Sequence, residues 1–530
     1  MKKCIKILSL LIVMSLLVCL FTACGKESGD KPADTTTAAP TATNTSTAAA
    51  TSQSTPATNA LKQEKLLILT GADQPEQPDA QTVWDEIAKV TADNINVQIE
   101  VQSYAWGDYV QKVNTMAAAG QAFDIYLNFQ GFLNTDVTKK QCIELNDLID
   151  KYGQNLKKMI PSDLFGDTSI NGKIYGIPSN YPFVGGSAVI IRKDLREKYK
   201  IPEIKDLAGF EAYLDAVTKG EKGMSGFVGR GGAGGADFNL AFGPDVVNIG
   251  GDMATFAEID PTVKPYKVVS KFNCESTRKQ IEWHRKAYKN GWIPKDILTI
   301  KDENTLLASG KAAALCNDMW TVNSLGPIVS ANIPGAELET FTFRDYSKEM
   351  VRLSKVNNYS SISATSKNKE RAMMFLDWMR ASKENYELYM YGIKGKHWNP
   401  VGDDKYELPA GVDPSKRSYN PSPWFAKVMQ FDRLDKSSEP GFLHIYNQVV
   451  TAKYTTPKIL NFTFDSTPVK TEWTQVGTAY SEIWGPIGQG IKDSDADYQA
   501  AIEKLDKLGQ QTILKEIQNQ LDAWAAKNDK

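Results

Sequence analysis

Histidine is scarce in this sequence, and the motifs that build common metal and hydrolase sites are absent. The three histidines, His284, His397 and His444, share no metal-ligand spacing, and no H-E-x-x-H pair occurs. No G-x-S-x-G segment, the turn that carries the nucleophile of α/β hydrolases, occurs either. We therefore expect neither a metal nor a cofactor. A catalytic carboxylate pair stays open, because 63 acidic residues always allow two to meet in three dimensions.

Cysteine is also scarce, and neither sign of charge is in excess. Three of the six cysteines fall in the first 24 residues, which leaves Cys142, Cys274 and Cys316 far apart in the remainder. Such a sparse, odd set is no disulfide framework; one bridge stays open, and three buried thiols are favoured. With 61 basic and 63 acidic residues the net charge is −2, which argues against nucleic acid as a partner. The charge balance favours a small, roughly neutral partner.

The N-terminus has the pattern of an export signal. A short basic region at residues 1–6 precedes an apolar run over 7–21, which is shorter than the ~20 residues of a comfortable membrane span. The run ends in Leu20-Phe21-Thr22-Ala23-Cys24, which resembles the lipobox of bacterial lipoproteins, with Phe21 where leucine is usual. The resemblance implies a signal peptide over 1–23 and a lipid on Cys24. The alternative is an uncleaved membrane anchor.

Residues 24–60 consist largely of Thr, Ala, Ser and Pro. A stretch with so few large apolar side chains cannot offset the entropy of ordering, so we expect a flexible tether. About 470 residues remain, too many for one core when domains usually hold ~100–200 residues. The sequence therefore predicts two lobes behind a tether.

Helical and strand patterns alternate after the tether. An apolar run at 65–70 predicts a buried strand, and the following patterns predict a helix over 82–91, a strand over 97–102, a helix over 109–119 and a strand over 123–127. Further helices are expected over 370–381 and from about 498 to 526. Alternation of this kind indicates an α/β fold with a largely parallel sheet.

Several segments, in order, are similar to the extracellular solute-binding proteins of family 1. The most specific is Gly172-Lys173-Ile174-Tyr175-Gly176-Ile177-Pro178, close to the family's Gly-Lys-x-Tyr-Gly-x-Pro segment. Other matching segments are 116–125, 192–202, 309–320 and 362–379. Within the family, 391–398 resembles a segment of the LipO-like subgroup, with Lys394 in place of the usual glutamate.

The resemblance implies a two-lobed, type II periplasmic-binding-protein-like α/β fold, with a hinge and a ligand cleft between the lobes. By that pattern lobe 1 comprises 61–178 plus about 356–395, and lobe 2 comprises about 179–355 plus 396–530. It also implies a monomeric, non-enzymatic receptor on the extracytoplasmic face of the cell membrane. The receptor would bind a sugar, with an oligosaccharide favoured, and deliver it to the permease of an ABC importer.

A sugar site needs aromatic plates and planar hydrogen-bonding groups, since sugars present both hydroxyls and apolar C–H faces. Trp320, which ends Asn317-Asp318-Met319-Trp320, matches a tryptophan that commonly stacks on sugar in the family. Polar side chains at the carboxyl ends of strands face the crevice of an open α/β sheet. The candidate ligand contacts are Trp320, Asp318, Asn128, Gln130, Asn180, Tyr181, Trp106 and Trp398. For a single tryptophan, packing in a core is the competing interpretation.

Two segments match the start of known ligand-binding motifs but lack residues that those motifs need. The glycine-rich segment 229–234 fits G-x-G-x-x-G but precedes no clear helix and has no P-loop lysine, so a loop is favoured over a dinucleotide site. The acidic segment 493–497 begins like a calcium loop, yet Tyr498 stands where glycine is needed. As alternatives to a receptor we keep a surface-anchored glycoside hydrolase or lyase and, third, an adhesion lipoprotein.

Overall fold

The computed structural model describes residues 61–529 except 74, 181–186, 230–240, 243–245, 250–256 and 352–355, and leaves undescribed the side chains of 130, 187, 248, 249 and 461. The expected signal peptide, Cys24, the tether, Tyr181 and most of the glycine-rich segment lie outside the described residues. Residues 59–530 form one compact unit. Within its described part, no helix is both long and apolar enough to cross a membrane.

The first sheet is built around an apolar strand, β1 (Glu64–Ala72), that pairs in parallel with β2 (Val97–Ala105) and β3 (Ile125–Phe129). The antiparallel strand β15 (Asn358–Ile362) and β6 (Ile177–Pro178) complete the order β2-β1-β3-β15-β6. Strand β1 buries Leu66, Ile68 and Leu69 completely in the first core.

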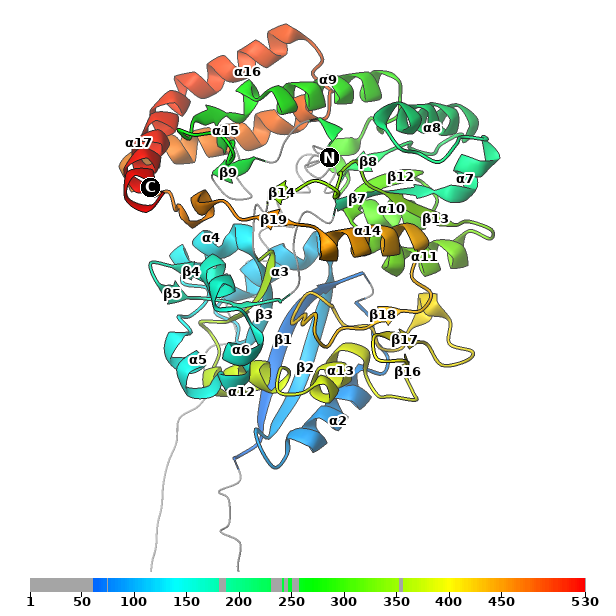
Figure 1. Cartoon of the computed structure of the whole chain (residues 1–530), viewed down its shortest axis with the longest axis vertical. Coiled ribbons are helices and arrows are strands. Elements are labelled where there is room, and N and C mark those ends of the chain that lie inside the picture. Colours follow the sequence, from blue (N-terminus) through cyan, green and yellow to red (C-terminus); the bar gives the residue numbers. More distant parts are fainter. Residues whose placement is uncertain are drawn as a thin grey trace, which may run out of the picture. The chain divides into compact units, whose positions relative to one another are not determined.

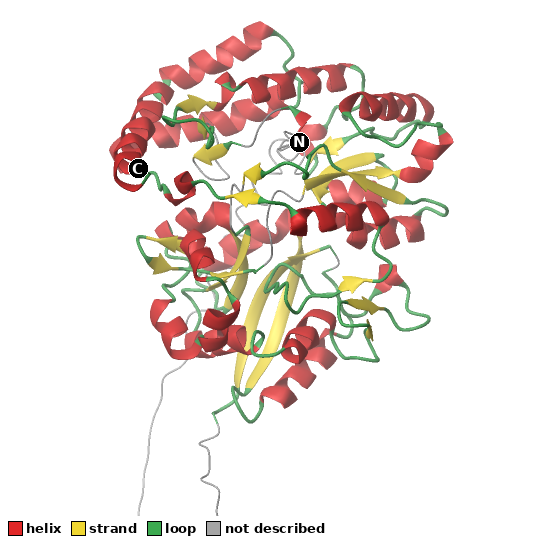
Figure 2. Ribbon diagram, in the orientation of Figure 1, coloured by secondary structure: helices red, strands yellow, loops and turns green. Residues whose placement is uncertain are grey.

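Helices cover the first sheet, and short strands form two small separate sheets, β4-β5 and β16-β17-β18 (Figures 1 and 2). The helices are α2 (Ala80–Thr91), α3 (Trp106–Ala118), α4 (Leu133–Thr138), α5 (Asn146–Tyr152), α6 (Gln154–Met159), α12 (Lys369–Trp378) and α13 (Lys383–Tyr391). The short strands are β4 (Ser169–Ile170), β5 (Lys173–Ile174), β16 (Asn399–Val401), β17 (Lys405–Glu407) and β18 (Leu434–Asp435). The predicted alternation of helices and strands over 65–127 is therefore present.

The second core surrounds a four-stranded sheet of order β13-β7-β12-β8. The strands are β7 (Ser187–Arg192), β8 (Val228–Gly229), β12 (Ala314–Asp318) and β13 (Leu338–Phe341). They pack with α7 (Lys193–Lys198), α8 (Leu207–Gly220), α10 (Glu303–Ala308), α11 (Thr321–Asn332) and α14 (Pro440–Thr451). Beside this core the short strands β14 (Met350–Val351) and β19 (Tyr454–Thr455) pair in parallel. Two α/β cores in one chain establish the expected two-lobed, periplasmic-binding-protein-like fold.

One stretch packs differently from the predicted lobe boundary. The family pattern puts 396–530 in the second lobe and the C-terminal helices, but Tyr419, Phe425 and Val428 are buried in the first core. The backbone of the same stretch is fixed there, because Asn180 N donates to Lys427 O over 2.8 Å and Met429 N donates to Asn180 O. The chain therefore stays with the first core until about β18 and joins the second at α14.

A third core accounts for the C-terminal residues. Its sheet consists of β9 (Val247–Ile249), β10 (Ala257–Ile259) and β11 (Val268–Ser270). The sheet packs with the helices α9 (Glu275–Lys289), α15 (Lys470–Gly488), α16 (Asp495–Lys507) and α17 (Gln510–Asn528). These helices lie side by side in Figure 1. The single helix expected from about 498 to 526 is wrong. Gly509, with φ of +100°, takes a left-handed conformation that ends one helix and starts the next.

Cys142, Cys274 and Cys316 are all free thiols, as favoured from their spacing. Cys142 and Cys316 are buried, whereas Cys274 is half-buried.

Candidate functional site

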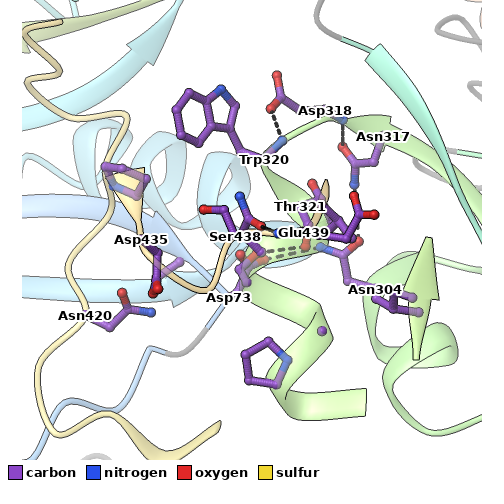
Figure 3. Close-up of a pocket in the computed structure, with 18 of the residues that line it drawn as sticks. Asp73, Asn304, Asn317, Asp318, Trp320, Thr321, Asn420, Asp435, Ser438 and Glu439 are labelled. Atoms are coloured by element: carbon purple, nitrogen blue, oxygen red, sulfur yellow. Dashed lines mark hydrogen bonds between the residues drawn. The ribbon is translucent and has the colours of Figure 1, made fainter. Parts of the chain in front are cut away.

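A cleft of about 1740 Å³ is lined by residues of both α/β cores. Segments of the first core contribute Ala72 and Asp73 at the end of β1 and the 419–424 loop, and segments of the second contribute 301–304, 317–318 and 320–324. Figure 3 shows side chains from these separate segments facing one another. Strands β1 and β12 both point their carboxyl ends at the cleft, which is where ligands bind in open α/β sheets.

A chain of hydrogen bonds links the two cores across this cleft. Asn304 Nδ2, at the start of α10, donates to Asp73 Oδ1 over 3.2 Å. Asn317 Nδ2 donates to Asn304 Oδ1 and to Glu303 Oε1, each over 3.2 Å. Alternating amides and carboxylates of this kind offer the planar hydrogen-bonding groups that sugar hydroxyls need.

None of the four residues of this chain, Asp73, Asn304, Asn317 and Glu303, is among the ligand contacts expected from the sequence. Asp73 is the one contributed by the first core. Enclosure by protein atoms raises the pKa of its carboxyl, hydrogen bonds from Ser324, Asn304 and Trp106 oppose that rise, and the nearby Asp302 carboxylate adds to it. Its signal in the sequence was its place directly after the first buried strand, the same rule that selected Asn128.

Trp320 and Asp318 lie together in the turn between β12 and α11. Asp318 Oδ1 accepts a hydrogen bond from Trp320 N over 2.9 Å, and Asn317 Oδ1 accepts one from Asp318 N over 2.8 Å, so the turn is fixed by two side chains. Trp320 is half-buried and lines the cleft. Its turn brings the indole to the boundary between the two cores.

The Trp320 ring has close neighbours on several sides. Phe442 and Tyr446 of its own core lie with ring centroids 4.8 and 5.6 Å away, and Trp424 of the first core lies 6.3 Å away at 82°. The ammonium of Lys427 sits over the ring, 3.8 Å from its centroid. Such a position is a cation–π contact, so one face of the indole is already covered.

Trp106 and Trp398 also line the cleft, but they differ in how much of the side chain is exposed. Trp106 is half-buried at the start of α3, packs edge-on to Phe129, and hydrogen-bonds to Asp73. Trp398 is only 3 % exposed, and its indole N–H donates to Gly392 O over 3.0 Å. Trp106 therefore offers more surface to a ligand than Trp398.

Asn128 and Asn180 do not line the cleft. Asn128 is buried, and its amide donates over 2.7 Å to the buried Asp136 carboxylate. Asn180 Nδ2 donates to Met159 O over 3.0 Å. Both side-chain amides are hydrogen-bonded to groups of the protein itself. Their positions directly after a strand do not predict these partners. Gln130 starts a 3₁₀ turn, but its side chain is outside the described residues, as is Tyr181.

The 413–441 region supplies cleft residues with no clear signal in the sequence. They include Arg417, whose guanidinium is 2.9 Å from Asp435, and Glu439, which caps α14 by accepting from Gly441 N and Phe442 N. Burial raises the pKa of Glu439. In the described part of the chain, no cluster of His, Cys, Asp and Glu is arranged to hold a metal ion.

The fold and the sequence are similar to known proteins. Residues 86–395 match the family model of bacterial extracellular solute-binding proteins, and 458–526 match a domain of unknown function. A carbohydrate ABC transporter substrate-binding protein of Streptococcus pneumoniae serotype 4 is 23 % identical over 82 % of this chain and 86 % of its own length.

Solved structures show the same fold. The N-glycan transport solute-binding protein of Streptococcus pneumoniae in complex with Man1GlcNAc has a TM-score of 0.70 at 18 % identity, over 87 % of this chain and 99 % of that one. An alginate-binding protein, AlgQ2, has a TM-score of 0.62 at 18 % identity, over 86 % of this chain and 98 % of that one. The family match spans more than half of the sequence, and this chain belongs to the bacterial extracellular solute-binding protein family.

Proposed function

We propose that this protein is a lipid-anchored receptor that captures a carbohydrate in the cleft between its lobes and delivers it to the permease of an ABC importer. The observation that carries the proposal is the cleft itself, with Trp106 and Trp320 beside the carboxylates and amides of Asp73, Asn304 and Asp318. Aromatic faces match the C–H faces of a sugar, and the polar groups match its hydroxyls.

The ligand class follows from the size of the cleft and from the relatives. A volume of about 1740 Å³ exceeds the ~300–1,000 Å³ of ordinary small-molecule sites, which favours an oligosaccharide. One similar structure holds Man1GlcNAc and another Man5GlcNAc. These relatives are binding proteins of transporters, which supports a receptor rather than an enzyme.

The location and the partner rest on the family and on Cys24. Membership of an extracellular solute-binding family supports a location outside the cytoplasm, and a lipid on Cys24 would hold the chain at the membrane. The 24–60 tether would then let the cleft reach the permease. We propose a monomer in which ligand favours lobe closure by binding the closed form better.

The test is calorimetric titration of the full chain with mannose-, glucose- and N-acetylglucosamine-containing oligosaccharides, followed by mass analysis of the recovered sugar. A receptor binds at least one of them and returns it unchanged. Trp106→Ala should weaken that binding at least tenfold, whereas Trp524→Ala, in the third core, should leave it unchanged. Cleavage of the sugar, or no binding across the series, contradicts the proposal.

A further inference from the structure

Most of the positive charges of the cleft are paired with carboxylates of the protein. Six lysine and arginine residues line the described part of the cleft, Lys193, Arg196, Lys301, Arg417, Lys427 and Arg433. Five of them lie 2.5–2.9 Å from a carboxylate oxygen, of Glu337, Glu339, Asp435, Asp432 and Glu387 respectively. Within the described residues, Lys301 alone of the six has no carboxylate at this distance.

His397 adds no positive charge to the cleft. Its Nδ1 accepts a hydrogen bond from Ile393 N over 2.9 Å, which requires an unprotonated nitrogen there, and Nε2 faces Asp79 Oδ2 at 3.2 Å. Burial also lowers the pKa of His397, which favours the neutral form of the imidazole. A ligand in the cleft therefore meets a neutral imidazole.

Several carboxylates of the cleft, in contrast, are held by uncharged donors. Asp73 accepts from Asn304, Asp302 accepts from Thr305 N and Oγ1, and Glu439 accepts from two backbone amides. Such bonds orient a carboxylate without cancelling its charge. Burial raises the pKa of Asp73 and of Glu439, and the nearby carboxylates of Asp302 and Glu339 add to the respective rise.

Two more carboxylates line this side of the cleft, and both make further interactions. Glu303 follows Asp302 and accepts from Asn317, and Asp318 ends β12. Asp73, Asp318 and Glu439 all line the cleft. The described wall of the cleft is consequently rich in negative charge next to the aromatic side chains.

We infer that the cleft selects its ligand by charge: it accepts uncharged and amino sugars, and it excludes sugars that carry carboxylate, sulfate or phosphate groups, with Asp73 as a specificity-determining residue. The inference rests on the proposed carbohydrate function. Its physical basis is repulsion between like charges in a partly enclosed site. Such repulsion weakens the binding of anionic ligands and leaves the binding of neutral ligands unchanged.

A matched set of three trisaccharides tests the inference with the full chain. The set is the neutral N-acetylglucosamine trimer, its de-acetylated cationic form, and the neutral trimer oxidised at C6 to the uronate. The uronate should bind at least ~100-fold more weakly than the neutral trimer at low salt. Asp73→Asn should reduce that ratio at least threefold, and 1 M salt should reduce it as well. Equal or tighter binding of the uronate overturns the inference.

A second measurement needs no sugar, so it separates this inference from the proposed function. A cysteine is introduced at Thr321, which lines the cleft and is half-buried, and its modification by cationic and anionic methanethiosulfonates is followed by peptide mass. Relative to a cysteine at the exposed Val450, position 321 should favour the cationic reagent ~10-fold. If the Thr321 variant does not fold, Asn420→Cys replaces it.

An equal ratio at the two positions overturns the charge inference even if a sugar binds. A cationic preference without binding of any oligosaccharide supports the charge inference and contradicts the carbohydrate function.

Discussion

The ammonium of Lys427 lies 3.8 Å from the centroid of the Trp320 ring, and the two residues come from different cores. Lys427 is only 2 % exposed, and its ammonium lies 2.7 Å from an Asp432 carboxylate oxygen. The ion pair therefore holds the ammonium in its position over the ring. The contact joins the lobes beside the cleft. It also means that a sugar can stack on that face of Trp320 only after Lys427 moves away.

A double-mutant cycle measures the Lys427–Trp320 contact. Lys427→Met and Trp320→Leu should each lower the free energy of unfolding, and the coupling between them should be about 1–2 kcal/mol, the range for a desolvated cation–π pair. Urea unfolding of the four proteins gives the value. Lys427→Met also leaves Asp432 without its cation. The cost of this loss cancels in the cycle, because it occurs in both proteins that carry Lys427→Met. Additive effects would show that the contact contributes nothing.

Asn304→Ala should loosen the two lobes in the absence of ligand. The variant removes the bond to Asp73 across the cleft, and a hydrogen bond with a net value of about 0.5–1.5 kcal/mol shifts an open–closed equilibrium by ~2- to 13-fold. Small-angle scattering should then report a larger radius of gyration. Asn332→Ala is the matched control, since its amide donates to Ala308 O within the second core. An unchanged radius for Asn304→Ala would contradict this.

Gly71→Ala should displace Trp106 from the cleft. A Cβ at Gly71 would lie 2.4 Å from the Trp106 ring, so the indole has to move. We expect a lower melting temperature and at least tenfold weaker sugar binding. Gly166→Ala serves as control, because nothing lies within 4 Å of its added Cβ, and it should change stability by less than ~0.5 kcal/mol. Equal behaviour of the two variants would rule out the packing argument.

The stability of the protein should fall as pH drops from about 6.5 to about 4. Burial lowers the pKa of His284 from 6.5 to about 4, so in this window the unfolded chain binds a proton that the folded chain does not. Stability therefore rises with pH there, and the integrated loss at acid pH is about 3 kcal/mol from this residue. Melting temperatures at pH 7 and 4.5 should differ less in His284→Gln than in the parent. An identical pH dependence would exclude His284 as a cause.

Cys24→Ala should release the protein from the membrane. Without a thiol at this position no diacylglycerol can attach, and metabolic labelling with palmitate should fail. Fractionation of the expressing bacteria should find the variant in the medium or as an unprocessed precursor. A variant that still takes up the label would show that the anchor lies elsewhere.

The sequence alone predicted the α/β class and the family, because both depend on local patterns. The buried run at 65–70 and the segment from Gly172 to Pro178 are recognisable without any neighbour. Composition alone argued against nucleic acid as a partner. The same local rules placed Trp106, Asp318, Trp320 and Trp398 as candidates, and all four line the cleft.

Only the tertiary structure decided what those candidates contact. Asn128 and Asp73 both follow buried strands, yet Asn128 is tied to the buried Asp136 and Asp73 faces Asn304 across the cleft. Lys427 is about a hundred positions from Trp320, and the segment that carries it gives no periodic signal. Long-range pairings of this kind depend on how the cores pack, whereas the strands, the motifs and the charge balance are properties of the chain itself.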